Sequence, residues 1–137
     1  MEQSEKGSIG DLVWYRIETA KSDLKSADIL LREEEYRGAN NRAYYAIYHA
    51  ISAINALDGK SYKRHKDTLA NFNKDYVRTE IFPKNFGRKI AQAEEIRHAS
   101  DYDDFYIATK EKAEEQIITA KDLIEQIEAY CLKRLKR

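Results

Sequence analysis

NRAYYAIYHAISAINAL, residues 41–57, combines small apolar residues with an arginine, three tyrosines and a histidine. Its small residues recur at helical spacing and form a narrow seam with Leu57: Ala43, Ala46, Ala50, Ala53 and Leu57. Such a seam would let a neighbouring helix approach closely. The spacing predicts a helix from about Tyr36 to Leu57. Asp58-Gly59 is a suitable end, because glycine readily takes the left-handed cap conformation.

Two longer stripes flank this segment. One is Val13, Ile17, Ala20, Leu24, Ala27 and Leu31, and the other is Ala113, Ile117, Ala120, Ile124, Ile127 and Cys131. Their matching period, about 3.5 residues, suits helices packed nearly antiparallel in a bundle. Shorter helices are expected from about Tyr62 to Val77 and from a cap at Asn85 to about Asp101. Thr109 is expected to cap the last helix.

These patterns predict an all-α fold, an up-and-down helical bundle of four to five helices. Residues 11–135 are expected to form a single domain after a flexible leader, residues 1–10. A chain of 137 residues is long enough for one core. Five glycines and one proline offer little material for the turns of an all-β fold.

Composition limits the functional classes. Twenty-four Lys+Arg balance 24 Asp+Glu, which argues against indiscriminate affinity for nucleic acid. The lone Cys131 fits a reducing compartment. The polar start MEQSEKGSIG lacks a signal peptide's apolar run, and no stretch approaches a membrane span in length. We therefore expect a cytoplasmic protein that does not enter the membrane.

The first group of candidate site residues is Arg42, Tyr45, His49 and Ser52, spaced by three, four and three. They share one face of the predicted helix. Arg42 and His49 are two turns apart, roughly 10 Å along the axis, so one phosphodiester could lie between them. The alternative is that Tyr45 and His49 pack at the edge of the core with satisfied polar ends.

The second group lies in EEIRHASDYDD, residues 94–104. Arg97 and Asp101 are four residues apart, as are His98 and Tyr102, at the predicted end of a helix. We expect these side chains, with Arg97 and His98 foremost, to converge on one pocket for an anion. The alternative is an Arg97–Asp101 ion pair at a helix end, worth a few tenths of a kcal/mol if exposed.

A metal centre is not expected. Glu95 to His98 is one E-x-x-H motif, whereas a di-iron bundle needs two and further inward glutamates. His65 lies on an apolar face and is expected to be a hydrogen-bonded histidine at the edge of the core. The sequence also has no glycine-rich phosphate loop and no G-x-S-x-G motif, so no cofactor is expected.

The segments 41–57, KRHKDTLANFNKDYVRTEIFPKNFGRKI (63–90) and IRHASDYDDF (96–105) together resemble prokaryotic HEPN domains, in particular their small stand-alone subgroup. The likeness extends over roughly residues 11–131. It implies a helical bundle that commonly pairs as a homodimer, often with a minimal nucleotidyltransferase as partner in a toxin–antitoxin pair. An exposed tyrosine-rich surface around Tyr44, Tyr48 and Tyr106 is expected to favour the dimer.

The resemblance also implies ribonuclease chemistry without a metal, because many HEPN proteins cleave RNA with an arginine and a histidine. Their signature is Arg, usually a polar residue, four to six further positions, then His. Arg42 and His49 have that spacing, but Ala43 replaces the polar residue. Arg97-His98 occupies the family's usual location, where Asp101 and Tyr102 follow in place of a second histidine.

Three hypotheses of function result. The first is a dimeric binding module for nucleotide or RNA phosphate, associated with a nucleotidyltransferase. The second is an active, metal-independent endoribonuclease toxin, in which arginine stabilises the transition state and histidine moves the proton. The third is a purely structural bundle. The first-choice site residues are Arg97, His98, Asp101 and Tyr102, and the second choice is Arg42 and His49.

Overall fold

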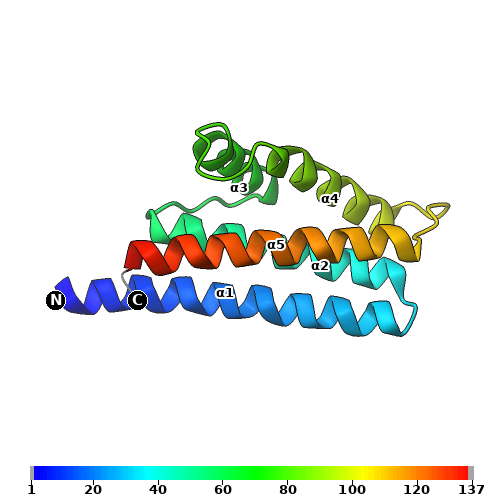
Figure 1. The fold of residues 1–137 in the computed structure, drawn as a ribbon, viewed down its shortest axis with the longest axis horizontal. Coiled ribbons are helices and arrows are strands. Elements are labelled where there is room, and N and C mark those ends of the chain that lie inside the picture. The colour runs from blue at the N-terminus through cyan, green and yellow to red at the C-terminus, as the bar shows by residue number, and fades with distance from the viewer. Residues whose placement is uncertain (1, 136–137) are drawn as a thin grey trace.

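The structure is a computed structural model that describes residues 2–135, with side chains described from residue 9 onward. The described chain is helical and without strands: α1 (Glu2–Arg32), α2 (Tyr36–Leu57), α3 (His65–Phe72), a π-helical turn η1 (Asn73–Val77), α4 (Asn85–Tyr102) and α5 (Lys110–Leu135). The long helices α1, α2, α4 and α5 alternate in direction along the chain (Figure 1). The predicted all-α, up-and-down bundle is therefore confirmed.

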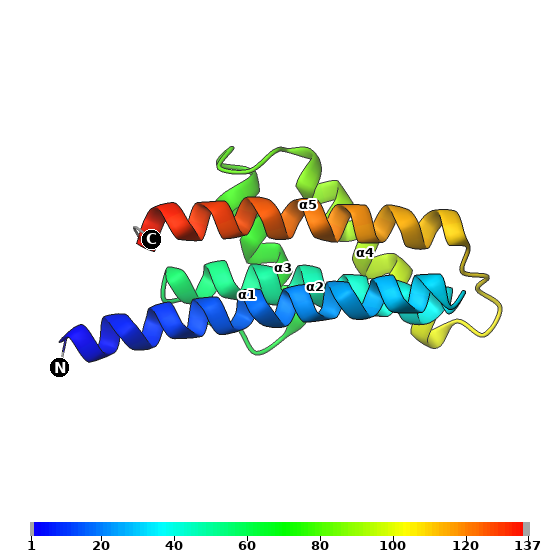
Figure 2. The same cartoon turned by 60° about the horizontal axis from the view of Figure 1, so that its bottom comes forward.

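Helix α2 is the centre of the bundle, in contact with α1, α3, α4 and α5. Figures 1 and 2 show α1 and α5 beside it and α3 and α4 on the remaining side. Its four predicted seam alanines are at most 1% exposed, as are Ile47, Ile51 and Ile54. The helix ends at the residues expected from the sequence, Tyr36 and Leu57. Because other helices cover most of α2, its half-buried polar residues Arg42, Tyr45 and His49 are held in fixed positions.

The two outer stripes are buried as predicted. All six members of the α5 stripe are at most 8% exposed, and Val13, Ile17, Ala20 and Ala27 of α1 are at most 1% exposed. Leu24 and Leu31 are partly buried against the same core. Helices α1 and α5 also contact one another, in opposite directions (Figure 2).

Helix ends agree with the sequence in two places and differ in one. Gly59 has a φ of +70° and follows the end of α2, where Lys60 N donates to Asn55 O at 2.7 Å. Thr109 Oγ1 accepts a hydrogen bond from Lys112 N at 3.2 Å, as a cap of α5 should. The predicted cap at Asn85 is wrong: Asn85 is the first residue of α4, and Lys84 before it makes no side-chain cap.

Two boundaries also differ from the expectation. Helix α1 begins at Glu2, so residues 2–10 continue the helix that was expected from about Asp11. This segment lacks an apolar stripe but contains no proline, so nothing in it blocks the helix. The third helix begins at His65 instead of Tyr62 and changes to π-helical spacing at Asn73.

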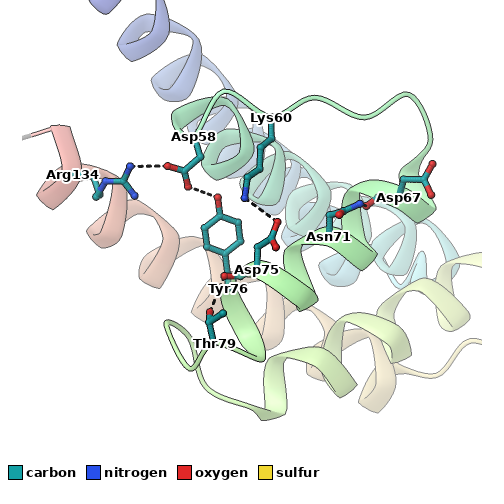
Figure 3. A network of polar contacts seen from close by, with 8 residues as sticks. All are labelled: Asp58, Lys60, Asp67, Asn71, Asp75, Tyr76, Thr79 and Arg134. Atoms are coloured by element: carbon teal, nitrogen blue, oxygen red, sulfur yellow. Dashed lines mark hydrogen bonds and ion pairs between the residues drawn. The ribbon is translucent and has the colours of Figure 1, made fainter.

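A polar network fastens the end of α2 to η1 and α5 (Figure 3). Asp58 accepts hydrogen bonds from the Tyr76 hydroxyl and, at 2.7 Å, from Arg134 Nη2. Lys60 Nζ donates to Asp75 Oδ2 at 2.9 Å. Tyr76 is 2% exposed, so its hydroxyl needs this acceptor. The network belongs to the scaffold and lies at the end of α2 opposite to Tyr36.

Within residues 2–135, none of the helices is both long enough and apolar enough to cross a lipid bilayer.

Candidate functional site

Arg97 of α4 points toward α2 and is enclosed by tyrosine rings. Its Nη2 donates to the Tyr45 hydroxyl at 3.0 Å. Its guanidinium carbon lies 5.4 Å from the ring centroid of Tyr44, 5.5 Å from that of Tyr45 and 5.7 Å from that of Tyr102. All three rings are within the range of cation–π attraction. Arg97 is therefore held in a fixed orientation where α4 packs against α2.

Asp101, one turn further along α4, is the acidic partner of Arg97. Its Oδ2 lies 3.2 Å from Arg97 Nε, although that nitrogen has no partner in hydrogen-bonding geometry. Burial alone would lower the pKa of Arg97, but Tyr45 and Asp101 outweigh it and raise the pKa. Arg97 is thus a permanent cation.

The second-choice pair, Arg42 and His49, is joined by a carboxylate from α1. Asp23, which is 8% exposed, accepts a hydrogen bond from Arg42 Nη1 at 3.1 Å. Its other oxygen lies 2.7 Å from His49 Nδ1. One buried carboxylate therefore orients a guanidinium and an imidazole together, and it leaves His49 Nε2 for another partner.

The structure brings the two candidate groups together at Tyr45. The Arg42 guanidinium lies 5.0 Å from the Tyr45 ring centroid, over the same ring that Arg97 contacts, and the His49 ring is 6.2 Å away. We name this cluster the Tyr45 site and define it as Asp23, Arg42, Tyr45, His49, Arg97 and Asp101. It is built by α1, α2 and α4, with two cations at one aromatic ring.

His98 does not join the Tyr45 site. Its side chain is exposed, and its ring lies 4.9 Å from that of Tyr102, which is 65% exposed. Neighbouring residues of an α-helix point about 100° apart, so Arg97 faces α2 while His98 is turned outward. The convergence of Arg97 and His98 on one pocket is thus not observed. Tyr102, which contacts both side chains, is their shared neighbour.

His65 extends the site on its α3 side. Its ring stacks on Tyr48 at 3.9 Å between centroids, and its Nδ1 is hydrogen-bonded to the Tyr44 hydroxyl at 3.2 Å. The expectation of a hydrogen-bonded histidine at the core edge is confirmed. Burial lowers the pKa of His65, and the positive charges of Arg97 and His49 lower it further, while Glu94 opposes them.

Lowering the pH should therefore cost stability through His65. The native state favours the neutral imidazole, so the unfolded chain binds more protons, and the free energy of unfolding rises with pH. This contribution is present above the unfolded pKa of about 6.5 and is lost as pH falls toward the folded value. In urea titrations at pH 7.5 and pH 5, His65→Phe should lose less stability than wild type. An equal or larger loss in the variant would contradict this assignment.

The expected exposed tyrosine surface is only partly present. Tyr44 is 2% exposed, because it lies beneath Arg97 and His65, so its predicted exposure is wrong. Tyr48 and Tyr106 are half-buried. The large apolar side chains that do face solvent near the end of α4 are Tyr102, Phe105 and Ile107.

Arg37 fixes the segment after α4, a role that the sequence did not suggest. It donates to the backbone oxygens of Ser100 at 2.8 Å, Asp103 at 3.1 Å and Tyr106. Ser100 is 4% exposed and its hydroxyl accepts a hydrogen bond from Asn40 Nδ2 at 3.2 Å. Ser100 thus ties α4 to α2, and the segment that carries Asp101 and Tyr102 is anchored from both sides.

Arg37→Ala should destabilise the protein by about 1–3 kcal/mol, because hydrogen bonds to a charged donor are among the stronger ones. The loss should appear first as faster amide exchange in residues 103–109, measured by hydrogen–deuterium exchange. Arg78→Ala, which removes an exposed arginine, is the control and should change neither quantity. Unchanged exchange in residues 103–109 would show that Arg37 does not hold this segment.

The remaining candidates for reactive chemistry are metal-ligating side chains, the E-x-x-H motif and Cys131. Among the residues that the structure describes, no three His, Cys, Asp or Glu side chains form a group that could hold a metal ion. Glu95 and His98 of the E-x-x-H motif are both exposed. Cys131 is fully buried, and burial raises the pKa of its thiol to about 12, which disfavours the reactive thiolate.

The fold and this site define an all-α protein with a cationic, aromatic cluster between its second and fourth helices. A model of the HEPN domain matches residues 13–130, and the chain belongs to the HEPN family. It is 30% identical over 126 residues to a Thermotoga maritima protein named "UPF0332 protein". The aligned region covers 92% of this chain and 95% of that protein.

Two relatives from Methanocaldococcus jannaschii carry the name "Putative toxin". One is 32% identical, over 81% of this chain and 82% of its own length. The other is 29% identical, over 72% of this chain and 67% of its own length.

Proposed function

We propose that this HEPN protein binds the phosphate groups of RNA or nucleotides at the Tyr45 site as one member of a toxin–antitoxin pair. The observation that carries the proposal is the placement of Arg42 and Arg97 over a single tyrosine ring, with His49 beside it. The names of the two archaeal relatives support the toxin–antitoxin context.

The chemistry of the site suits a phosphodiester. A guanidinium has five N–H donors in a planar fork that can hold two phosphate oxygens at once. Arg97 commits Nη2 to Tyr45, and Arg42 commits Nη1 to Asp23, so both keep further donors. Exposed Tyr102 adds an aromatic face on which a base can stack. The site therefore offers both contacts that a single-stranded nucleotide needs.

The proposal includes assembly. We expect a homodimer and a minimal nucleotidyltransferase partner, because the HEPN resemblance implies both. We also expect a cytoplasmic location. The exposed side chains of Tyr102, Phe105 and Ile107 are apolar surface of the kind found in interfaces. Sedimentation equilibrium at micromolar concentration tests the dimer: about twice the chain mass supports it, and a mass near 16.0 kDa contradicts it.

A second candidate function, metal-independent endoribonuclease, is favoured by the contact of 2.7 Å between Asp23 and His49 Nδ1. A carboxylate that orients an imidazole prepares its other nitrogen for proton transfer. His49 would take the proton of a 2′-hydroxyl, whose oxygen attacks the adjacent phosphorus to form a 2′,3′-cyclic phosphate. The bond from phosphorus to the 5′-oxygen then breaks, and the leaving 5′-oxygen takes up the proton from the imidazolium of His49. Arg42 and Arg97 would stabilise the charge that develops on the phosphate.

Cleavage of mixed RNA in the presence of EDTA separates the two functions. If the protein is a nuclease, wild type should cleave, and His49→Ala and Arg97→Ala should each lose at least about a hundredfold in rate, as expected for a lost proton-transfer or charge-stabilising group. His98→Ala should keep most of the rate.

If the protein is a binding module, wild type should bind RNA without cleaving it. Arg88→Ala is the control in both assays, since Arg88 is an exposed arginine of the same helix. Neither binding nor cleavage by wild type would refute the Tyr45 site as a phosphate site.

A further inference from the structure

A small polar cavity lies beside the Tyr45 site and shares no residue with it. Its volume is about 60 Å³, it is partly open to solvent, and it is bordered by α1, the second half of α2, the loop before α3, and α3 itself. The lining residues used below are Arg16, Tyr48, Ser52, Asn55, Lys60 and Ser61. The ring of Tyr48 also stacks on His65, so the cavity adjoins the Tyr45 site without belonging to it.

The lining carries positive charge and hydroxyl groups. Arg16 and Lys60 are its charged members, and none of the described residues that line it is acidic. Arg16 Nη1 donates a hydrogen bond to the backbone oxygen of Ser52 at 2.9 Å, and the other four N–H donors of the guanidinium remain for a ligand. Lys60 donates one hydrogen to Asp75, outside the lining, and that bond raises the pKa of Lys60 against the effect of burial. Both side chains are therefore cations with donors to spare.

Asn55 supplies an independent sign that a polar partner is missing. It is 3% exposed, it lines the cavity, and its Oδ1 has no hydrogen-bond partner. An unsatisfied buried acceptor costs about 1–3 kcal/mol, so such groups are uncommon in native proteins. Oδ1 is itself closed to solvent, so the atom of Asn55 that a ligand in the cavity can reach is Nδ2, which can donate to a phosphate oxygen.

The size selects the ligand. One water molecule needs about 10–15 Å³ of space open to the centre of a water-sized sphere. The cavity has about 60 Å³ of this space, which is room for on the order of four oxygen-sized groups. A phosphate group has four oxygens. Because the cavity is partly open to solvent, a phosphate monoester can enter by its phosphate while the rest of the molecule stays outside.

We propose that this cavity binds a single phosphate group, as inorganic phosphate or as the terminal phosphate of a monoester, held by Arg16, Lys60 and Asn55. The phosphate end of an RNA strand is one source of such a group, and that case rests on the proposed function. Free inorganic phosphate is the other source and is independent of it.

Calorimetric titration with inorganic phosphate at constant ionic strength tests the proposal. Wild type should bind one phosphate per chain. Arg16→Gln should weaken binding by about tenfold or more, since it removes a charge-assisted hydrogen bond. Asn55→Asp should abolish binding, because it places a carboxylate in the cavity. Arg78→Gln, an exposed control, should stay within about twofold of wild type.

A second readout guards against a variant that is merely unfolded. Phosphate should raise the melting temperature of wild type, as a ligand of the native state must, and should raise that of Arg16→Gln much less. Circular dichroism establishes that each variant is helical. The absence of any heat or melting shift with wild type would overturn the proposal. So would phosphate binding that Arg97→Ala removes and Arg16→Gln preserves, because the anion would then occupy the Tyr45 site.

Paired oligoribonucleotides identify the source. If a strand end enters the cavity, an oligomer with a terminal phosphate should bind more tightly than its hydroxyl-ended twin, and Arg16→Gln should erase the difference. Equal affinity for the twins, together with binding of inorganic phosphate, assigns the cavity to the free ion. Failure of the two proposals can be told apart. RNA binding as such depends on Arg97, whereas the preference for a terminal phosphate depends on Arg16.

Discussion

Arg97→Ala should weaken the binding of single-stranded RNA by about tenfold to a hundredfold. Arg97 is fixed by Tyr45 and Asp101 before any ligand arrives, so little side-chain entropy is lost on binding. A hydrogen bond from a charged donor is worth about 1.5–3 kcal/mol, and each 1.4 kcal/mol corresponds to a tenfold change in affinity. Fluorescence anisotropy with a labelled oligoribonucleotide measures the change.

Two controls show whether the loss is specific. Arg88→Ala removes the same charge from an exposed position of α4 and should stay within about twofold of wild type. The dependence of log affinity on log salt should become shallower by about 0.7 in Arg97→Ala, as expected for one lost phosphate contact with a single strand. Equal losses in Arg97→Ala and Arg88→Ala would mean that RNA responds to overall charge and not to the Tyr45 site.

Ile54→Ala should lower the free energy of unfolding by about 2–5 kcal/mol. Ile54 lies in the last turn of α2 and is 0% exposed. Its truncation removes buried apolar contacts and leaves a cavity that the surrounding helices fill only in part. A loss of this size is a large share of the stability of a single domain, and urea unfolding followed by circular dichroism should reveal it.

Ile118→Ala is the matched control, with the same chemical change on a helix of the same bundle. Ile118 is 66% exposed on α5, so its truncation should cost no more than about 0.5 kcal/mol. Similar losses for the two variants would contradict the central position of α2. A loss for Ile118→Ala alone would indicate that α5 is covered by a partner in solution.

Much of the fold could be predicted because apolar spacing is a local property. The stripe of α5 and the alanine seam of α2 are each readable within one helix, and both are buried. Gly59 and Thr109 also act on their own helix ends, which is why their roles were predictable. Helix α1 begins at Glu2 and not near Asp11, because a segment without an apolar stripe can still be helical when no proline blocks it.

The site was harder to predict because its contacts join distant helices. Spacing placed Arg42 with His49 and Arg97 with Asp101, but it could not place the two groups at one ring. Asp23 does carry a signal in the sequence: it lies three residues after Ala20 and four before Ala27, so it is a carboxylate beside the buried stripe. Arg37 had none, since its acceptors are backbone oxygens more than sixty residues away.

The most direct measurement is the position of a bound phosphate. A crystal structure with a short oligoribonucleotide, its 2′-hydroxyl at the scissile position replaced by hydrogen to prevent cleavage, would provide it. The Tyr45 site predicts a phosphate whose oxygens lie within about 3.2 Å of donors from both Arg42 and Arg97. An oligonucleotide bound elsewhere on the bundle, with both guanidiniums still turned only to Asp23, Tyr45 and Asp101, would contradict it.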